Sequence, residues 1–290
     1  MRQGLQLLIV LVVVLVGGVV GYSLIFAEDE QPALRLVEAS GTVMRIGPGV
    51  QGQALAVGDE LSARDGVQVG EGASAVLGLG DETRLELHSS SSMRVVDVDA
   101  GGVRVELESG RVSARVRPGG GQVGVSSRGR AVYGSDADFT VAVEEDGLFV
   151  TQAERGTLRT EGMEGLPESV AAGMLLSAMP DRQAVLGAVP DLLKLEVSWP
   201  DPLRVRLPEL VIEGQTGPYV QVSVGDGERW TRIRSGAEGS FRAPLALQLG
   251  PNRVQVEVRD ALGNRREDER VVERERTAPS ILGSEVQWGR

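Results

Sequence analysis

The residues best suited to acid–base chemistry lie in the stretch GSDADFTVAVEEDGLFVTQAERGTLRT, residues 134–160. Asp136 and Asp138 are two positions apart, so on a strand their carboxyl groups would point the same way. Two carboxyl groups about 5 to 10 Å apart in a cleft can hydrolyse a glycosidic bond. The stretch contains no Tyr, Trp or His to support such a site. We therefore expect these two carboxylates to have a structural role at a corner of the chain.

The same stretch has the pattern of a β-hairpin. Apolar residues alternate from Phe139 to Val143, which places them on one face of a strand. The pair Asp146-Gly147 favours a turn, and Phe149 begins the returning strand. Glu144 and Glu145 are then expected at the solvent end of the hairpin.

His88 is the only histidine in the chain, so zinc sites with two histidines and most phosphotransfer schemes are excluded. It follows TRLEL and precedes four serines, which predicts a solvated residue at the end of a strand, then a polar loop. These serines have no lysine nearby to activate them, because Lys194 is far away in sequence. The segment RPGGGQ, residues 117–122, lacks the Lys and Ser or Thr of a phosphate-binding loop and is expected to be a flexible hairpin.

Metal binding is not expected. The chain has no cysteine, which excludes disulfides and thiolate-bound metals. Asp226, Asp260 and Asn264 offer oxygen ligands, but the regular ligand spacing of a calcium-binding loop is absent. We predict no metal, no cofactor and no catalytic residue. Trp230 could serve as a binding platform, although a single Trp in a β-sandwich more often belongs to the core.

Composition favours a β-rich protein. Val is the most common apolar residue, Gly is abundant with 39 copies, and aromatic residues make up only 3% of the 290 residues. The net charge of −11 argues against nucleic acid, since phosphate binding needs a concentrated basic face. The length allows two domains with cores of their own.

The N-terminal residues 5–27, LQLLIVLVVVLVGGVVGYSLIFA, form an apolar segment. As a helix, 23 residues would reach about 34 Å, enough to cross a membrane. Arg2 precedes the segment and Glu28, Asp29 and Glu30 follow it, so residues 1–4 are expected in the cytoplasm and the rest of the chain outside. The alternative is a signal peptide cleaved after Gly21. Gly17 and Gly21 could also let two such helices pack closely, although a passive anchor is the simpler interpretation.

Period-2 alternation dominates the remaining sequence and predicts many short strands. Residues 168–179, ESVAAGMLLSAM, fit either a strand or a short helix, and residues 182–189, RQAVLGAV, are equally ambiguous. We expect an all-β protein whose parts are a cytoplasmic head (1–4), an anchor (5–27), a linker (28–38), a first β-domain (39–180), a proline-punctuated linker (181–203), a second β-domain (204–276) and a tail (277–290).

The first β-domain resembles the FecR domain. The resemblance is carried by SGTVMRI, by LAVGDELSARDGVQVGEGASAVLGLGDETRLEL, by LESGRVSARV and by the 134–160 stretch, which follow one another in the family's order. Two departures concern corners: Gly80-Asp81 reverses the family's usual Asp-Gly order, and GSDADF replaces Gly-Thr-x-Phe with one or two extra residues. The resemblance implies a β-domain of short strands, stacked or barrel-like, in an envelope protein.

The second β-domain resembles bacterial Ig-like domains, through GSFRAPLALQLGPNRVQVEVRDALGNRRE. The Gly263-Asn264 pair is a favourable hairpin corner. The resemblance implies an antiparallel β-sandwich that acts as a spacer or as a binder of carbohydrate or protein.

The FecR resemblance implies sensing, assembly or partner recognition in the envelope. The best-known members regulate a sigma factor through a cytoplasmic N-terminal domain, and with only residues 1–4 before the apolar segment we do not expect direct anti-sigma activity. We predict a non-enzymatic protein of the bacterial inner membrane, with one span and its bulk in the periplasm, that binds an envelope protein or a glycan. It would be secreted instead if the signal is cleaved. The alternatives are the sensor arm of a signalling system with a separate cytoplasmic regulator and, less favoured, a glycan-active enzyme or its accessory module. The binding face and the oligomeric state are left open.

Overall fold

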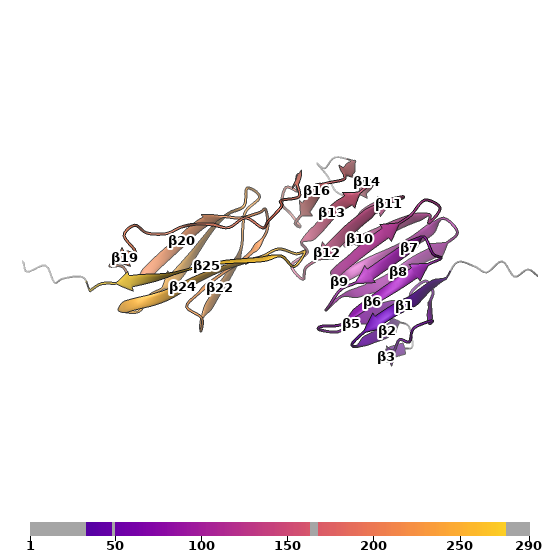
Figure 1. The fold of residues 1–290 in the computed structure, drawn as a ribbon, viewed down its shortest axis with the longest axis horizontal. Helices are drawn as coiled ribbons and strands as arrows, with labels where there is room; N and C mark the ends of the chain where they lie inside the picture. The colour runs from indigo at the N-terminus through magenta and orange to yellow at the C-terminus, as the bar shows by residue number, and fades with distance from the viewer. Residues whose placement is uncertain (1–32, 48–49, 163–167, 277–290) are drawn as a thin grey trace, which may run out of the picture.

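The computed structural model describes residues 33–47, 50–162 and 168–276, and these residues form two β-sandwiches arranged end to end (Figure 1). The prediction of an all-β protein is confirmed for this part of the chain. None of the described residues form a helix that could span a membrane, and the expected anchor at 5–27 lies outside them.

The first sandwich consists of two sheets that share one long strand. In spatial order, sheet A contains β4 (Glu60–Leu61), β1 (Leu34–Ser40), β6 (Ser74–Leu79), β7 (Thr83–Leu87), the second half of β9 (Gly102–Val116), β12 (Asp138–Val143), β13 (Phe149–Arg155), β16 (Met174–Ala178) and β17 (Val185–Ala188). Sheet B contains β3 (Val50–Ala54), β2 (Val43–Gly47), β5 (Gly66–Val69), β8 (Ser92–Asp99), the first half of β9, β10 (Gln122–Ser127), β11 (Arg130–Gly134), β14 (Thr157–Glu161) and β15 (Ser169–Ala171).

Strand β9 passes from one sheet to the other at Gly110. Residues up to Ser109 pair with β8 in sheet B, and Gly110 pairs with Val143 in sheet A. Gly110 has a φ of 89°, and a Cβ there would lie 2.4 Å from Ser91 Oγ, so only glycine fits this bend. Alternating residues of both sheets, among them Leu77, Val105 and Phe139, are fully or almost fully buried in one core between them.

The second sandwich is smaller. Sheet C contains β18 (Glu196–Ser198), β20 (Glu209–Gln215) and β23 (Ser240–Ala246). Sheet D contains β19 (Arg204–Val205), β25 (Arg265–Arg274), β24 (Gly250–Arg259), β21 (Gln221–Gly225) and β22 (Trp230–Arg234). Its core is separate and includes Ile212, Val222, Phe241 and Val256.

The strands extend beyond the domain boundaries expected from sequence. Strand β1 begins at Leu34, inside the expected first linker, because Leu34 and Leu36 already alternate into the core. The expected second linker contains β17, which completes sheet A, and β18, which belongs to sheet C. The ambiguous stretch 168–179 contains β15 and β16, separated by a turn at Gly173 with a φ of 79°.

Candidate functional site

The outer face of sheet B carries a row of polar side chains across five strands. Register places Asp97 of β8 opposite Arg104 of β9, Arg104 beside Gly124 of β10, Gly124 opposite Tyr133 of β11, and Tyr133 opposite Arg159 of β14. Because neighbouring residues in register share a face, these side chains project together into solvent. Gly124 contributes no side chain to the middle of the row, and a hollow opens next to it, beside Gln122 and the Gly101-Gly102 turn.

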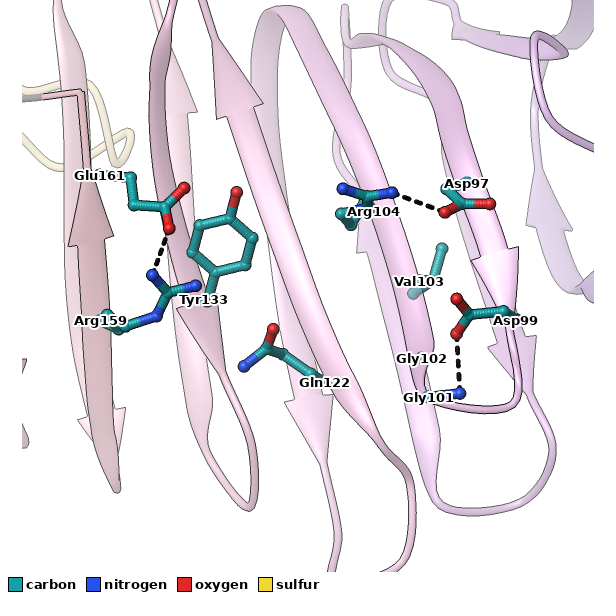
Figure 2. Close-up of a pocket in the computed structure, with 10 residues that line it drawn as sticks. All are labelled: Asp97, Asp99, Gly101, Gly102, Val103, Arg104, Gln122, Tyr133, Arg159 and Glu161. Atoms are coloured by element: carbon teal, nitrogen blue, oxygen red, sulfur yellow. Dashed lines mark hydrogen bonds and ion pairs between the residues drawn. The ribbon is translucent and has the colours of Figure 1, made fainter.

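The hollow has a volume of about 390 Å³. Figure 2 shows it bounded on one side by Tyr133 and Arg159 and on the other by Arg104 and Asp97, with Gln122 between them. The Tyr133 ring leans over Gly124, where a Cβ would come within 2.8 Å of two ring carbons. The glycine is therefore needed for the ring to lie where it does.

Every charged side chain that borders the hollow has a partner. Arg104 Nη2 donates to Asp97 Oδ2 at 2.6 Å, and Arg159 donates to Glu161, which stands two residues further along β14. The Arg159 guanidinium carbon also lies 4.5 Å from the centroid of the Tyr133 ring. Asp99 accepts from the Gly101 backbone N–H at 2.7 Å. These contacts fix the planar groups in place and pair the charges of Arg104 with Asp97 and of Arg159 with Glu161.

The electrostatics keep Glu161 ionised and Tyr133 neutral. The hydrogen bond from Arg159, and then that from Tyr133, lower the pKa of Glu161 below its ordinary value. Burial, and then the interaction with Glu161, raise the pKa of Tyr133. An aromatic ring beside fixed, planar hydrogen-bonding groups suits a ligand with an apolar face and a polar rim, such as a sugar ring.

The acidic residues of the hairpin are held by arginines. Asp138, on β12, accepts from Arg155 Nε at 3.2 Å and lies 3.4 Å from Arg117 Nη1, while Asp136 Oδ1 lies 2.5 Å from Arg155 Nη1. Burial on its own raises the pKa of Asp138, but the Arg155 hydrogen bond and the Arg117 charge outweigh it, so the pKa is lowered. The general acid of a glycosidase needs a raised pKa. This arrangement fits a braced corner.

The predicted hairpin is present as β12 and β13, and its turn contacts the second sandwich. Arg234 of β22 lies 2.6 Å from Glu144 and 2.7 Å from Asp146, and its side chain is 16% exposed. Glu144 therefore lies in an ion pair between the sandwiches instead of at a free solvent end.

His88 is less solvated than the sequence suggested. Its Nε2 lies 2.9 Å from Ser113 Oγ, which lies 3.0 Å from Thr140 Oγ1, and Thr140 donates to Glu154 at 3.1 Å. Burial, and then the charge of Arg111, lower the pKa of His88. The nearest carboxylate oxygen, of Glu86, is 3.9 Å from His88 Nδ1, too far for a hydrogen bond that would orient the ring. Sequence inspection could not find this row of hydrogen-bonded side chains, because His88 follows β7 whereas Ser113 lies in β9.

The oxygen ligands considered for calcium are engaged with other groups. Asp226 accepts from the backbone N–H of Arg229 at 2.8 Å, which with the Arg229 side chain lowers its pKa to about 2. Asp260 lies in the turn between β24 and β25 and accepts hydrogen bonds from the backbone and side-chain nitrogens of Asn264. No group of three or more potential metal ligands occurs in residues 33–47, 50–162 and 168–276.

Trp230 differs from the sequence expectation of a core residue. It is 38% exposed because β22 is an edge strand and the ring lies over Gly225, its partner in register. Trp199, which is partly buried, instead packs against the core of this sandwich, and its Nε1 donates to Asp268 at 2.8 Å.

Sequence reasoning missed the site on sheet B. Tyr133 was recognised only as part of a short strand, and nothing in its neighbourhood connects it with Asp97 or Arg104. The parallel pairing of β9 with β10, which brings the row together, has no local sequence signature. The only usable signal was the rarity of aromatic residues, three of them tyrosines in the whole chain.

Comparison with known proteins identifies the class of the first sandwich. The sequence profile of the family described as "FecR protein" matches residues 65–158, from β5 into β14. The chain therefore contains a FecR domain, as the sequence motifs indicated.

Among solved structures, the chain is similar to a proposed anti-sigma factor from Parabacteroides distasonis ATCC 8503. Two crystal structures of that protein match with a TM-score of 0.38 each, at 18% and 17% sequence identity, over 42% of this chain. The matched region spans 59% of the length of that protein. No curated protein matches the chain in sequence.

Proposed function

We propose that the protein is a non-enzymatic, membrane-anchored binding protein of the bacterial envelope, and that its FecR domain recognises a glycan through the hollow on sheet B. The FecR domain supports a role in envelope sensing and signalling. The observation that carries the choice of ligand is the hollow itself, with Tyr133 beside side chains whose charges are already paired.

A glycan fits this site better than an anion or an apolar peptide. An anionic ligand would have to displace Asp97 from Arg104 or Glu161 from Arg159. An apolar peptide would bury these polar groups without partners, which costs free energy. A neutral sugar can place its C–H face against Tyr133 and its hydroxyl groups against Gln122 and the paired carboxylates. These properties favour an uncharged saccharide over the protein partner that the sequence also allowed.

The proposed absence of catalysis rests on the chemistry of the carboxylates and of His88. Asp138 is a poor proton donor because arginines lower its pKa. His88 and Ser113 are in hydrogen-bond contact, but the 3.9 Å gap to Glu86 leaves the imidazole without a carboxylate to orient it. We expect no release of sugar when the full chain is incubated with peptidoglycan fragments. Cleavage that is lost in Ser113→Ala or Asp138→Asn would show that the protein is an enzyme.

Binding can be tested with the full chain in lipid nanodiscs and an N-acetylglucosamine tetrasaccharide, by isothermal titration calorimetry. Tyr133→Ala should weaken binding by about tenfold, the amount that a lost stacking contact of about 1.4 kcal/mol produces. Trp230→Ala, which removes the half-exposed aromatic residue of the other sandwich, is the matched control and should leave the affinity unchanged. Loss of binding in Trp230→Ala alone would move the site to the Ig-like sandwich.

The alternative role, the sensor arm of a signalling system with a separate cytoplasmic regulator, is favoured by the FecR domain. It can be tested with a photo-cross-linking amino acid at position 122, inside the hollow, and at position 231 as a control, in cells that express the full chain. Capture of wall glycan at position 122 supports the proposed ligand. Capture of an envelope protein there, with no glycan, would replace it with a protein partner.

A further inference from the structure

A second, apolar cavity of about 240 Å³ lies between the two sandwiches, away from the hollow on sheet B. The first sandwich, which contains the FecR domain and is called the FecR sandwich from here on, contributes Val150, Ser177 and Gly187 of β13, β16 and β17 to the wall. The Ig-like sandwich lines it with Tyr219, from the loop before β21, and Leu262, from the turn between β24 and β25. The cavity therefore exists only while the two sandwiches are docked.

The strand register explains why this wall is apolar. Val150 pairs with Ala142 on one side and Ser177 on the other, and Ser177 pairs with Val185, so a row of small and apolar side chains crosses four strands. Ala142, Val150 and Tyr219 are at most 5% exposed and belong to one cluster, which is distinct from the cores of both sandwiches.

Ser177 is the exception in this row. Its side chain lines the cavity, the residue is 5% exposed, and its hydroxyl makes no hydrogen bond with any residue that the structure describes. The Ser177 Oγ atom is not buried in the wall but remains accessible inside the cavity. A ligand with one hydrogen-bonding group could therefore reach it.

The charged residues that line the cavity already have partners. Lys194 Nζ lies 3.2 Å from Glu196, and Asp260 accepts from the backbone and side-chain nitrogens of Asn264, each at 2.8 Å. The Lys194 charge is therefore paired, and both carboxylate oxygens of Asp260 already accept hydrogen bonds from a neutral residue. The paired lysine favours an uncharged molecule over a fatty acid.

Gly187 shows that there is room beside Ser177. It lies in the row adjacent to Ser177 and pairs with Leu175, and a Cβ built on it would meet no atom within 4 Å. Its φ is not in the left-handed region, so a larger side chain can be accommodated without backbone strain.

We propose that this cavity binds a small uncharged molecule with an apolar body and one hydrogen-bonding group that meets Ser177. Because a cavity of roughly 150 Å³ holds benzene, this one should hold about ten non-hydrogen atoms. Walls from both sandwiches mean that the ligand binds the docked arrangement in preference to a separated one and shifts the population towards it.

The test uses octanol that carries a photoreactive diazirine, a probe of suitable size with one hydroxyl group. The full chain in nanodiscs is irradiated with the probe, and the labelled residues are mapped by mass spectrometry. We expect labelling at Leu175, Tyr219 and Leu262 that excess octanol suppresses. Gly187→Leu fills the cavity and should reduce this labelling at least about tenfold, whereas Gln68→Leu, which adds the same side chain to an exposed position on β5, should not.

A second variant keeps the proposal testable if Gly187→Leu does not fold. Ser177→Ala removes the hydrogen bond and should weaken competition by octanol about fivefold, the effect of roughly 1 kcal/mol, while competition by octane stays unchanged. Labelling confined to residues outside the cavity would overturn the proposal. An equal weakening of competition by octanol and by octane in Ser177→Ala would overturn it as well. Neither result depends on glycan binding, which is tested at Tyr133.

Discussion

The two outer faces of the FecR sandwich differ in what covers them. On sheet A, the face formed by Ala142, Val150 and Ser177 is apolar and lies under the second sandwich. On sheet B, the face formed by Arg104, Tyr133 and Arg159 is charged and lies open. In both sheets, outward-facing residues alternate with inward-facing residues. The inward-facing residues of the two sheets form one shared core.

This difference shows that the outward-facing residues of a strand indicate what covers that face of the sheet. Inner residues are apolar in both sheets because they fill the shared core, so they carry no information about function. Outward-facing residues that are apolar indicate contact with a second domain. Outward-facing residues that are charged indicate contact with solvent or with a polar ligand. The two faces can be tested against each other by making the same change in each.

The largest effect is expected from placing a carboxylate on each face. Val150→Glu puts a charge into the contact between the sandwiches, where Val150 is 5% exposed, and should destabilise the docked state by about 3 kcal/mol or more. Urea unfolding of the full chain in detergent, with small-angle scattering to follow separation of the sandwiches, measures this. Gln122→Glu on the open face should change stability by less than about 0.5 kcal/mol. Equal effects of the two changes would show that the covered face is not buried in solution.

A smaller effect is expected from removing one arginine from each region. Arg234→Met leaves Glu144 and Asp146 without their shared partner at a half-buried site and should cost about 1–2 kcal/mol. Arg104→Met breaks the exposed pair with Asp97, in which both side chains are about half exposed, and should leave the stability almost unchanged. Both values come from the same urea titrations. A larger loss of stability in Arg104→Met than in Arg234→Met would show that the exposed ion pair matters more than the one between the sandwiches.

Two glycine substitutions, one on each face, should change the stability of the protein in opposite directions. Gly187→Ala on the covered face meets no atom within 4 Å and should stabilise the protein by about 0.5 kcal/mol, because it restricts the unfolded chain. Gly124→Ala on the open face would approach the Tyr133 ring to 2.8 Å and push it outward, which should cost about 0.5 kcal/mol and weaken saccharide binding. Thermal unfolding and calorimetry report the two effects. Stabilisation by both substitutions would mean that the ring does not rest on Gly124.

Much of the fold could be predicted from the sequence, for a physical reason. Period-2 alternation and Gly-Asp corners are local signals, and they indicated the strands of the FecR domain, the β12–β13 hairpin and the second β-domain. Both β1 and β17 were assigned to linkers, β1 because it lies close to the acidic residues 28–30 and β17 because Pro180 and Pro190 flank it. Whether 168–179 was helix or strand depended on the pairing of β15 with β14 and of β16 with β13, contacts that the segment itself does not encode.

The candidate site was much harder to predict. It depends on β9 changing sheets at Gly110 and pairing in parallel with β10, which brings Asp97, Arg104 and Tyr133 into one row. Likewise, Glu144 was expected at a solvent end because the sequence does not show that Arg234, ninety residues later, lies beside it. Long-range register, not local propensity, creates both regions.

The smallest effect concerns the protonation of Tyr133 on the open face. Burial, and then Glu161, raise the pKa of Tyr133 above its ordinary value, so the phenol should stay neutral at a pH where an unfolded tyrosine ionises. A raised folded-state pKa gives stability that is present below the unfolded value of about 10 and is lost as the pH rises through the folded value. Glu161→Gln removes the negative charge and should move the pKa of Tyr133 back towards about 10. Ultraviolet difference titration against Tyr133→Phe isolates this residue, and an unchanged pKa in Glu161→Gln would show that the two side chains do not interact.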